Sequence, residues 1–166
     1  TCIHCAHLQP SVDSWKPTLA ADVRFEYVPG VFGGVWDNFA RAYFAAQIMG
    51  VQDKTHDAIF KAIHIERSIK TGDLPEIADL YAKQGVDREK FLATMQSFAV
   101  TAKLNRAKQF ALRTGVTGTP TMIVAGKYRV SVPQDRGFEG MLSTVDFLLG
   151  YERAAAAPAA PMPAAP

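Results

Sequence analysis

"GVTGTPTMIVAGKYRV", residues 115–130, carries the strongest signal for β-structure in the chain. Residues 121–124 form a short run rich in β-forming side chains, and residues 127–130 form a second. Ala125 and Gly126 between them are typical of a two-residue turn. The stretch therefore predicts an antiparallel β-hairpin late in the chain.

A proline opens this hairpin. Pro120 directly precedes the first strand, where a trans proline would fit a central position poorly because proline cannot donate a ladder hydrogen bond. A cis bond between Thr119 and Pro120 would resolve this conflict and would turn the Thr119 backbone toward a neighbouring active site. We therefore expect a cis-proline at position 120.

Upstream of the hairpin, residues 37–114 show a helical pattern almost throughout. Asp73 and Asp87 each precede a helical run, as capping residues do, and Gly115 follows the last run. Several helices without intervening strands favour a helical subdomain inserted into another fold. The helices are expected over about residues 37–49, 54–65, 75–84, 88–98 and 100–114.

The rest of the chain supplies four more segments. A first helix is expected over about residues 5–21. In residues 23–28 apolar and charged side chains alternate as they do in a half-buried strand, and Pro29 ends the run. A last helix is expected over about residues 138–151. Residues 153–166 are almost entirely alanine and proline, so we expect a disordered or extended tail.

Both cysteines of the chain lie in "TCIHCAHLQP", residues 1–10. Cys2 is expected at the N-cap of the first helix, where unpaired backbone N–H groups and the helix dipole favour an anion. Because a thiol reacts as its thiolate, this position suits a nucleophile, and His4 would add a second stabilising partner. Cys5 lies one turn on, close enough to resolve a mixed disulfide.

Two other interpretations of the cysteine pair are weaker. A structural disulfide that closes so short a loop would remove little entropy from the unfolded chain. A zinc site could draw on His4 or His7, but structural zinc needs four well-placed ligands and there is no second CxxC. The pattern therefore favours a redox pair and no metal.

Composition limits the remaining function classes. The chain has 166 residues, 48% of them hydrophobic, and a formal net charge of +2. It is long enough to bury a core, and no stretch approaches the roughly 18–20 apolar residues of a membrane span. So small a net charge does not indicate a nucleic-acid partner. A soluble monomer is the expectation.

Together these motifs resemble the DsbA family of thiol:disulfide oxidoreductases. The resemblance rests on CxxC at a helix start with a proline five residues after the second cysteine, on Thr-Pro at the opening of a late hairpin, and on the helices between them. It covers roughly residues 1–152 and includes "FGG" at 32–34 and "PQ" at 133–134. It implies an α/β, thioredoxin-like fold with an inserted helical subdomain.

The resemblance implies a role for each residue of the motif. Cys2 would be the attacking cysteine and Cys5 its partner, and His4 would stabilise the reduced thiolate so that the disulfide is readily donated. The dipeptide between the cysteines is Ile-His here, whereas the usual family dipeptide is Pro-His.

The resemblance also implies residues that bind substrate. Thr119 and cis-Pro120 would hold substrate backbone beside the disulfide, and Ile3 is a further candidate for substrate contact. Threonine at position 119 stands where the best-known members have valine.

The implied activity is that of a periplasmic dithiol oxidase. It would donate the Cys2–Cys5 disulfide to reduced, newly exported polypeptides without a cofactor, and a membrane quinone reductase of the DsbB type would reoxidise the pair. Two alternatives stay open: a reductase or disulfide isomerase on the same fold, and a non-catalytic, chaperone-like binding domain whose disulfide is structural.

A thioredoxin-like sheet normally has a central strand that leads directly into the CxxC helix. Only Thr1 precedes Cys2, so we expect the sequence to lack its N-terminal strand or strands, together with any signal peptide. The expected organisation is a thioredoxin-like part over residues 1–36 and 115–152, a helical insertion over 37–114, and a tail over 153–166.

Overall fold

The computed structural model describes residues 1–156 of the chain. Most of these residues are helical, and the strands among them form one two-stranded sheet. The elements in chain order are α1 (Ile3–Trp15), the 3₁₀ turn η1 (Lys16–Thr18), α2 (Val35–Ile48), α3 (Gln52–His64), α4 (Leu74–Ala82), α5 (Arg88–Met95), α6 (Phe98–Thr114), β1 (Thr121–Val124), β2 (Tyr128–Ser131) and α7 (Gly137–Ala156).

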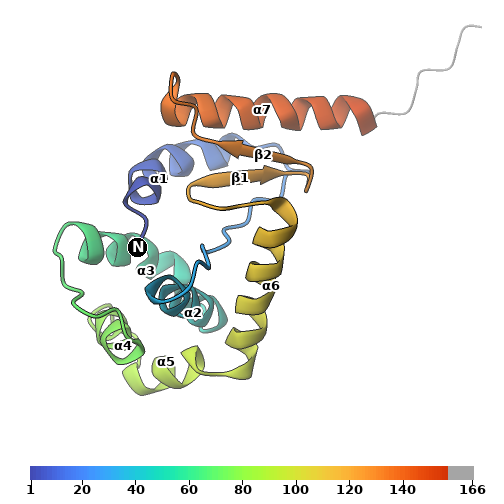
Figure 1. The fold of residues 1–166 in the computed structure, drawn as a ribbon. Helices are drawn as coiled ribbons and strands as arrows, with labels where there is room; N and C mark the ends of the chain where they lie inside the picture. Colours follow the sequence, from blue (N-terminus) through green and yellow to red (C-terminus); the bar gives the residue numbers. More distant parts are fainter. Residues whose placement is uncertain (157–166) are drawn as a thin grey trace, which may run out of the picture.

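The elements fall into two groups in space (Figure 1). Helix α7 lies across the β1–β2 hairpin at the top of the view, and α1 packs against α7 beside the hairpin. Helices α2 to α5 form the lower part, and α6 runs from there back up to the hairpin. The first and last helices of the described chain therefore lie together in the upper group.

Buried side chains form two separate clusters. The larger lies among α2 to α6 and includes Phe91 and Val100. The smaller lies between α1, the hairpin and α7 and includes Leu8, Val12 and Met141. The clusters fall on either side of the expected division at residues 37 and 114, and the division itself stays a prediction.

Local sequence signals set the helix ends. The Asp73 side chain accepts a hydrogen bond from the Glu76 amide, and Asp87 accepts one from the Lys90 amide, so both are N-caps as expected. Gly115 ends α6 in the left-handed conformation with φ 65°, which glycine adopts without steric cost.

The hairpin forms as expected. Thr121 pairs with Ser131 and Val124 with Tyr128 in an antiparallel register. The turn residues Ala125 and Gly126 have φ values of 51° and 68°, as the hairpin turns that match strand twist require. The expected cis bond between Thr119 and Pro120 is also present.

The expected strand over residues 23–28 is wrong. The alternation is real, because Val23, Phe25 and Tyr27 are half-buried whereas Arg24 and its neighbour Glu26 are exposed. A strand also needs a ladder partner, and within residues 1–156 no backbone-to-backbone hydrogen bond joins residues 24–32 to another segment. The segment packs one face on the small core without joining a sheet.

Two boundaries also differ from expectation. Helix α1 ends at Trp15 rather than near residue 21, and Pro17, which lacks an amide hydrogen, lies in the 3₁₀ turn that follows. At the other end, residues 153–156 of the expected tail are the last turn of α7, while residues 157–166 lie outside the described residues. No helix of the described chain is long and apolar enough to cross a membrane.

Candidate active site

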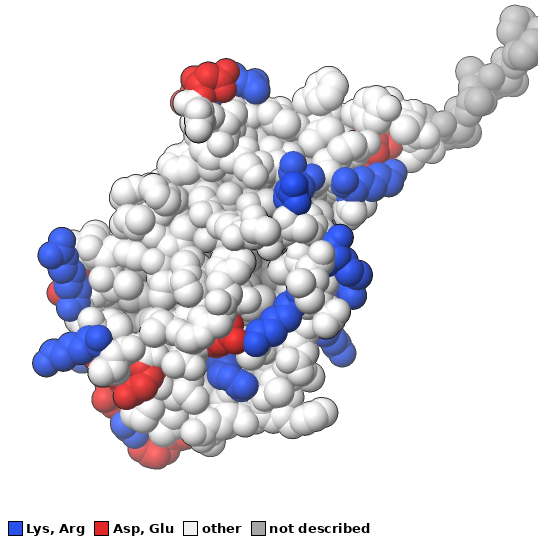
Figure 2. Space-filling view, viewed as in Figure 1, with Lys and Arg blue, Asp and Glu red and all other residues white. Residues whose placement is uncertain are grey.

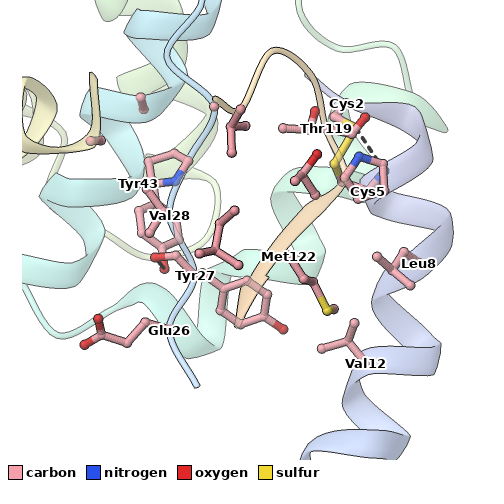
Figure 3. Close-up of a pocket in the computed structure, with 18 of the residues that line it drawn as sticks. Cys2, Cys5, Leu8, Val12, Glu26, Tyr27, Val28, Tyr43, Thr119 and Met122 are labelled. Carbon is pink, nitrogen blue, oxygen red and sulfur yellow. Dashed lines mark hydrogen bonds between the residues drawn. A yellow bond between two sulfur atoms is a disulfide. The ribbon is translucent and has the colours of Figure 1, made fainter. Parts of the chain in front are cut away.

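A disulfide joins Cys2 and Cys5 at the start of α1, with their Cα atoms 5.2 Å apart. Cys2 is the N-cap of this helix, and its Sγ accepts a hydrogen bond from the Cys5 backbone N–H at 3.0 Å. Figure 3 shows this bond as a dashed line beside the disulfide. A helix N-terminus offers unpaired amides and a positive dipole end, so the same donor favours negative charge on the Cys2 sulfur after reduction.

Thr119 faces the disulfide from the other end of the chain. Its carbonyl oxygen lies 3.7 Å from Cys2 Sγ, although the two residues are 117 positions apart. The cis bond to Pro120 follows directly, and β1 begins one residue later. The structure therefore brings together the two motifs that the sequence singled out separately.

Two of the expected site residues lie on the exposed side of α1. Ile3 and His4 are both exposed, and the His4 side chain makes no hydrogen bond within residues 1–156. Both therefore stand where an incoming molecule can reach them.

An aromatic pair beside Thr119 was not expected as part of the site. A Cβ atom placed on Gly30 would lie 2.8 Å from Phe32 Cε2, and 3.3 Å from both Thr119 Cγ2 and Trp36 Cε3. Phe32 and Trp36 pack edge to face with ring centroids 5.2 Å apart. A side chain at position 30 would therefore press on Phe32 and crowd Trp36 and Thr119, which surround this glycine. The glycine-rich loop is visible in the sequence. No local sequence pattern, however, indicates that this loop packs near Thr119.

Apolar side chains surround the disulfide. Ile3, Val28 and Phe32 are 39%, 47% and 40% exposed, which is high for large hydrophobic residues. Figure 2 shows a largely uncharged surface over the N-terminal end of α1 and the adjoining 23–32 segment. A surface of this kind suits a partner that presents apolar side chains.

A cavity of about 400 Å³ opens beneath the disulfide, between α1, the 23–32 segment and β1. In Figure 3, Leu8 and Val12 reach into it from α1, Met122 from β1 and Tyr27 from the opposite side, while Glu26 points away. Other residues that line the cavity include Cys2, Cys5, Val28, Phe32, Tyr43, His56, Thr119 and Val124.

Burial disfavours the charged forms of two side chains in the walls of this cavity. It lowers the pKa of His56 and raises the pKa of Tyr43, so both groups favour their neutral forms. The ring of His56 stacks obliquely on Tyr27, with centroids 5.4 Å apart. The cavity is therefore an apolar space beside the redox pair rather than a polar reaction centre. In the described part of the chain no three His, Cys, Asp or Glu side chains are grouped to hold a metal ion.

Comparison with known proteins agrees with this geometry. Residues 12–141 match the family model of the DSBA-like thioredoxin domain. A thiol:disulfide interchange protein DsbA of Pseudomonas aeruginosa is 42% identical over 155 residues, which cover 93% of this chain and 73% of that protein. The corresponding protein of Pseudomonas syringae pv. tomato is 41% identical over 155 residues, or 93% and 72% of the two chains.

Solved structures give the same result. The crystal structure of oxidoreductase DsbA from Xylella fastidiosa matches with a TM-score of 0.86 at 42% identity, covering 92% of this chain and 81% of that one. The crystal structure of Pseudomonas aeruginosa DsbA matches with a TM-score of 0.87 at 42% identity, covering 93% and 80%. These likenesses confirm the expected α/β, thioredoxin-like fold with a helical insertion. The chain therefore belongs to the DSBA-like thioredoxin domain family of thiol:disulfide oxidoreductases.

Proposed function

We propose that this protein oxidises pairs of cysteines in other polypeptides by giving up its own Cys2–Cys5 disulfide. The observation that carries the proposal is the position of Cys2 Sγ, which is the N-cap acceptor of α1 and lies opposite the Thr119 carbonyl. No other redox group is needed, because the disulfide itself accepts the two electrons.

The reaction takes place in two exchanges. A substrate thiolate attacks Cys2 Sγ, the Cys2–Cys5 bond breaks, and Cys5 leaves as a thiolate that takes up a proton. The second substrate thiolate then attacks the substrate sulfur of the mixed disulfide and releases Cys2. The substrate gains a disulfide and loses two electrons, and the protein gains two thiols.

Thiolate stabilisation sets the direction of this exchange. The Cys5 amide and the positive end of α1 favour a Cys2 thiolate, so Cys2 is a good leaving group in the second step. His4 is exposed, one position before Cys5, and would add a further polar partner for the Cys2 thiolate in the reduced protein. Stabilising the reduced form makes the oxidised form a stronger oxidant; DsbA is the standard example of this effect.

Substrate binds next to the sulfurs as extended chain. The Thr119 carbonyl offers a backbone acceptor beside Cys2, and Pro120 fixes the start of β1. Ile3 and Phe32 provide apolar contact on either side. Because unfolded polypeptides expose apolar side chains, such a surface suits newly exported, reduced proteins in the periplasm.

After substrate oxidation, a separate reaction must restore the Cys2–Cys5 disulfide. A membrane quinone reductase of the DsbB type would accept two electrons from reduced Cys2 and Cys5. The two cysteines would thereby form their disulfide again. The protein would work as a monomer, with both exchanges at one exposed site.

A trapping experiment tests the proposal. In Cys5→Ser, Cys2 is first converted to its mixed disulfide with glutathione. A reduced peptide with a single cysteine should then displace glutathione and stay joined to Cys2, which non-reducing electrophoresis and mass spectrometry detect. The matched variant Cys2→Ser, treated in the same way, should trap no peptide, because the attacked sulfur is gone. Equal trapping by the two variants, or oxidation of a reduced two-cysteine peptide that survives Cys2→Ser, would contradict the proposal. The second result would favour a binding domain with a structural disulfide.

A further inference from the structure

The loop of residues 30–34 and the first turn of α2 form one wall of the site. Gly33 and Gly34 have φ values of 90° and 54° and no neighbour within reach of a Cβ, so packing does not hold them. Yet Phe32 and Trp36 must keep their places against Thr119 for the wall to exist. The Gly34 carbonyl accepts the first hydrogen bonds of α2, and one side chain makes a further contact with the loop.

Asp37, in the first turn of α2, supplies that contact. Its Oδ1 accepts a hydrogen bond from the Gly33 N–H at 2.9 Å, which closes the loop directly after Phe32. Its Oδ2 lies 2.6 Å from Lys108 Nζ on α6. A carboxylate in the first turn of a helix is also favoured by the helix dipole.

The ion pair joins the two segments that approach the disulfide from this side. Lys108 belongs to α6, whose end leads through residues 115–118 to Thr119. Asp37 belongs to the first turn of α2, as Trp36 does, and α2 follows directly on the loop that holds Phe32. The ion pair therefore adds a polar contact to the apolar packing between α2 and α6, at the end of α2 that carries the aromatic wall.

The pair is only partly open to solvent. The Asp37 side chain is 19% exposed and that of Lys108 is 41% exposed, so water and salt screen the contact less than they screen a surface pair. Burial acts to raise the pKa of Asp37, but the hydrogen bonds from Lys108 and the Gly33 amide outweigh it and hold the pKa below its ordinary value. Asp37 is thus ionised, and the pair intact, throughout the neutral range.

We propose that Asp37, held by Lys108, is a positioning residue that sets the Phe32–Trp36 wall against Thr119 and so controls how well the site captures polypeptide substrates. This inference rests on the proposed function and deepens it. Asp37 touches neither sulfur in this arrangement. Its removal should therefore affect the binding of an extended chain while the intrinsic reactivity of the disulfide stays the same.

The test compares two reductants on three variants. Asp37→Ala removes both contacts, Asp37→Asn keeps an oxygen for the Gly33 amide but loses the charge, and Lys108→Met removes the cation. Oxidised glutathione is present to restore the Cys2–Cys5 disulfide after each turnover. For a reduced peptide with apolar residues beside its cysteines, kcat/KM should fall about fivefold in Asp37→Ala, equivalent to about 1 kcal/mol. The fall should be about two- to threefold in the other two variants and should reside mainly in KM.

Two readouts separate positioning from a general structural effect. The rate with dithiothreitol, which needs no peptide wall, and the reduction potential should both stay at their wild-type values. The variant Glu66→Gln is the control, because it breaks an exposed ion pair with Lys61 at the end of α3. Glu66→Gln should change neither the rate with the peptide nor the rate with dithiothreitol.

Coupling gives a third readout that does not depend on the size of any one effect. If the two side chains act through one contact, the double variant Asp37→Asn/Lys108→Met should lose no more activity toward the peptide than either single variant. Additive losses, equal losses with dithiothreitol, or an unchanged KM for the peptide would overturn the inference. Failure of the proposed function would look different, because the wild-type protein would then fail to oxidise the peptide even though dithiothreitol still reduced its disulfide.

Discussion

Two valines in the two cores should respond differently to the same change. Val12 on α1 is 2% exposed and Val100 on α6 is 0% exposed, so each is buried and each lies in a helix. They differ in surroundings, because Val12 lines the cavity beneath the disulfide and Val100 packs within the larger core. Val→Ala at each site removes the same two methyl groups, and the gain in helix propensity is similar at both.

The expected costs follow from these surroundings. Removing two buried methyl groups costs about 1.6 kcal/mol in transfer free energy at about 0.8 kcal/mol each. At Val100, if on the order of 40 Å³ stays unfilled, the new void adds about 1 kcal/mol, for a total of about 2.5 kcal/mol. At Val12 one side of the residue already borders open space, so fewer contacts are lost and the expected cost is about 1–1.5 kcal/mol.

Equilibrium unfolding of the oxidised protein in urea measures the difference. With an m-value of about 2 kcal/mol/M, the midpoint should fall by about 1.2 M for Val100→Ala and by about 0.6 M for Val12→Ala. The m-value should be the same for both variants and for the wild type. A loss at Val12 equal to or greater than that at Val100 would refute the idea that the core beneath the disulfide is the less tightly packed one.

Three further results follow from the site and the fold. His4→Ala should lower the reduction potential by about 10–20 mV in glutathione buffers, since an exposed polar contact is worth about 0.5–1 kcal/mol and 30 mV corresponds to about 1.4 kcal/mol; an unchanged potential would remove His4 from the mechanism. Phe32→Ser should reduce kcat/KM for an apolar reduced peptide about tenfold and leave the rate with dithiothreitol unchanged, and a parallel loss in both would contradict the proposed contact. Hydrogen bonds from the amides of residues 70–72 lower the pKa of the Glu76 carboxyl to about 2, so its stabilising effect is fully present above its ordinary value of 4.5 and is lost as the pH falls toward 2. Wild type and Glu76→Gln should therefore differ in urea midpoint at pH 6 and converge near pH 2, and a constant difference would contradict the assignment.

Local signals were enough to predict the helices. N-capping depends on a side chain and an amide three residues apart, so Asp73 and Asp87 were recognisable from sequence. The same holds for Cys2, whose place at the start of α1 follows from its position before a helical run. The turn at Ala125 and Gly126 is equally local.

Pairing and long-range packing were not predictable in this way. Alternation correctly predicted which side chains of residues 23–28 face inward, but a strand exists only with a ladder partner elsewhere in the chain, and none is present in residues 1–156. The Asp37–Lys108 pair joins residues far apart in sequence, and so does the approach of Phe32, Trp36 and Thr119 to Gly30. Their residue types carry no local signature, so only the folded chain reveals them.

The approach of Cys2 to Thr119 is a long-range contact that could nevertheless be predicted in part. Neither residue predicts the other from spacing, because they are 117 positions apart. The resemblance of the two motifs to one family supplied the expectation, and the 3.7 Å approach of Cys2 Sγ to the Thr119 carbonyl agrees with it.

The reduction potential of the Cys2–Cys5 pair tests the central claim most directly. It is measured by equilibrating the protein with glutathione buffers and following the disulfide by tryptophan fluorescence or by alkylation and mass spectrometry. Stabilisation of the Cys2 thiolate by the N-terminus of α1 predicts an oxidising reduction potential. It should be well above that of thioredoxin, which is about −270 mV. A potential at or below about −270 mV would contradict disulfide donation and would identify the chain as a reductant instead.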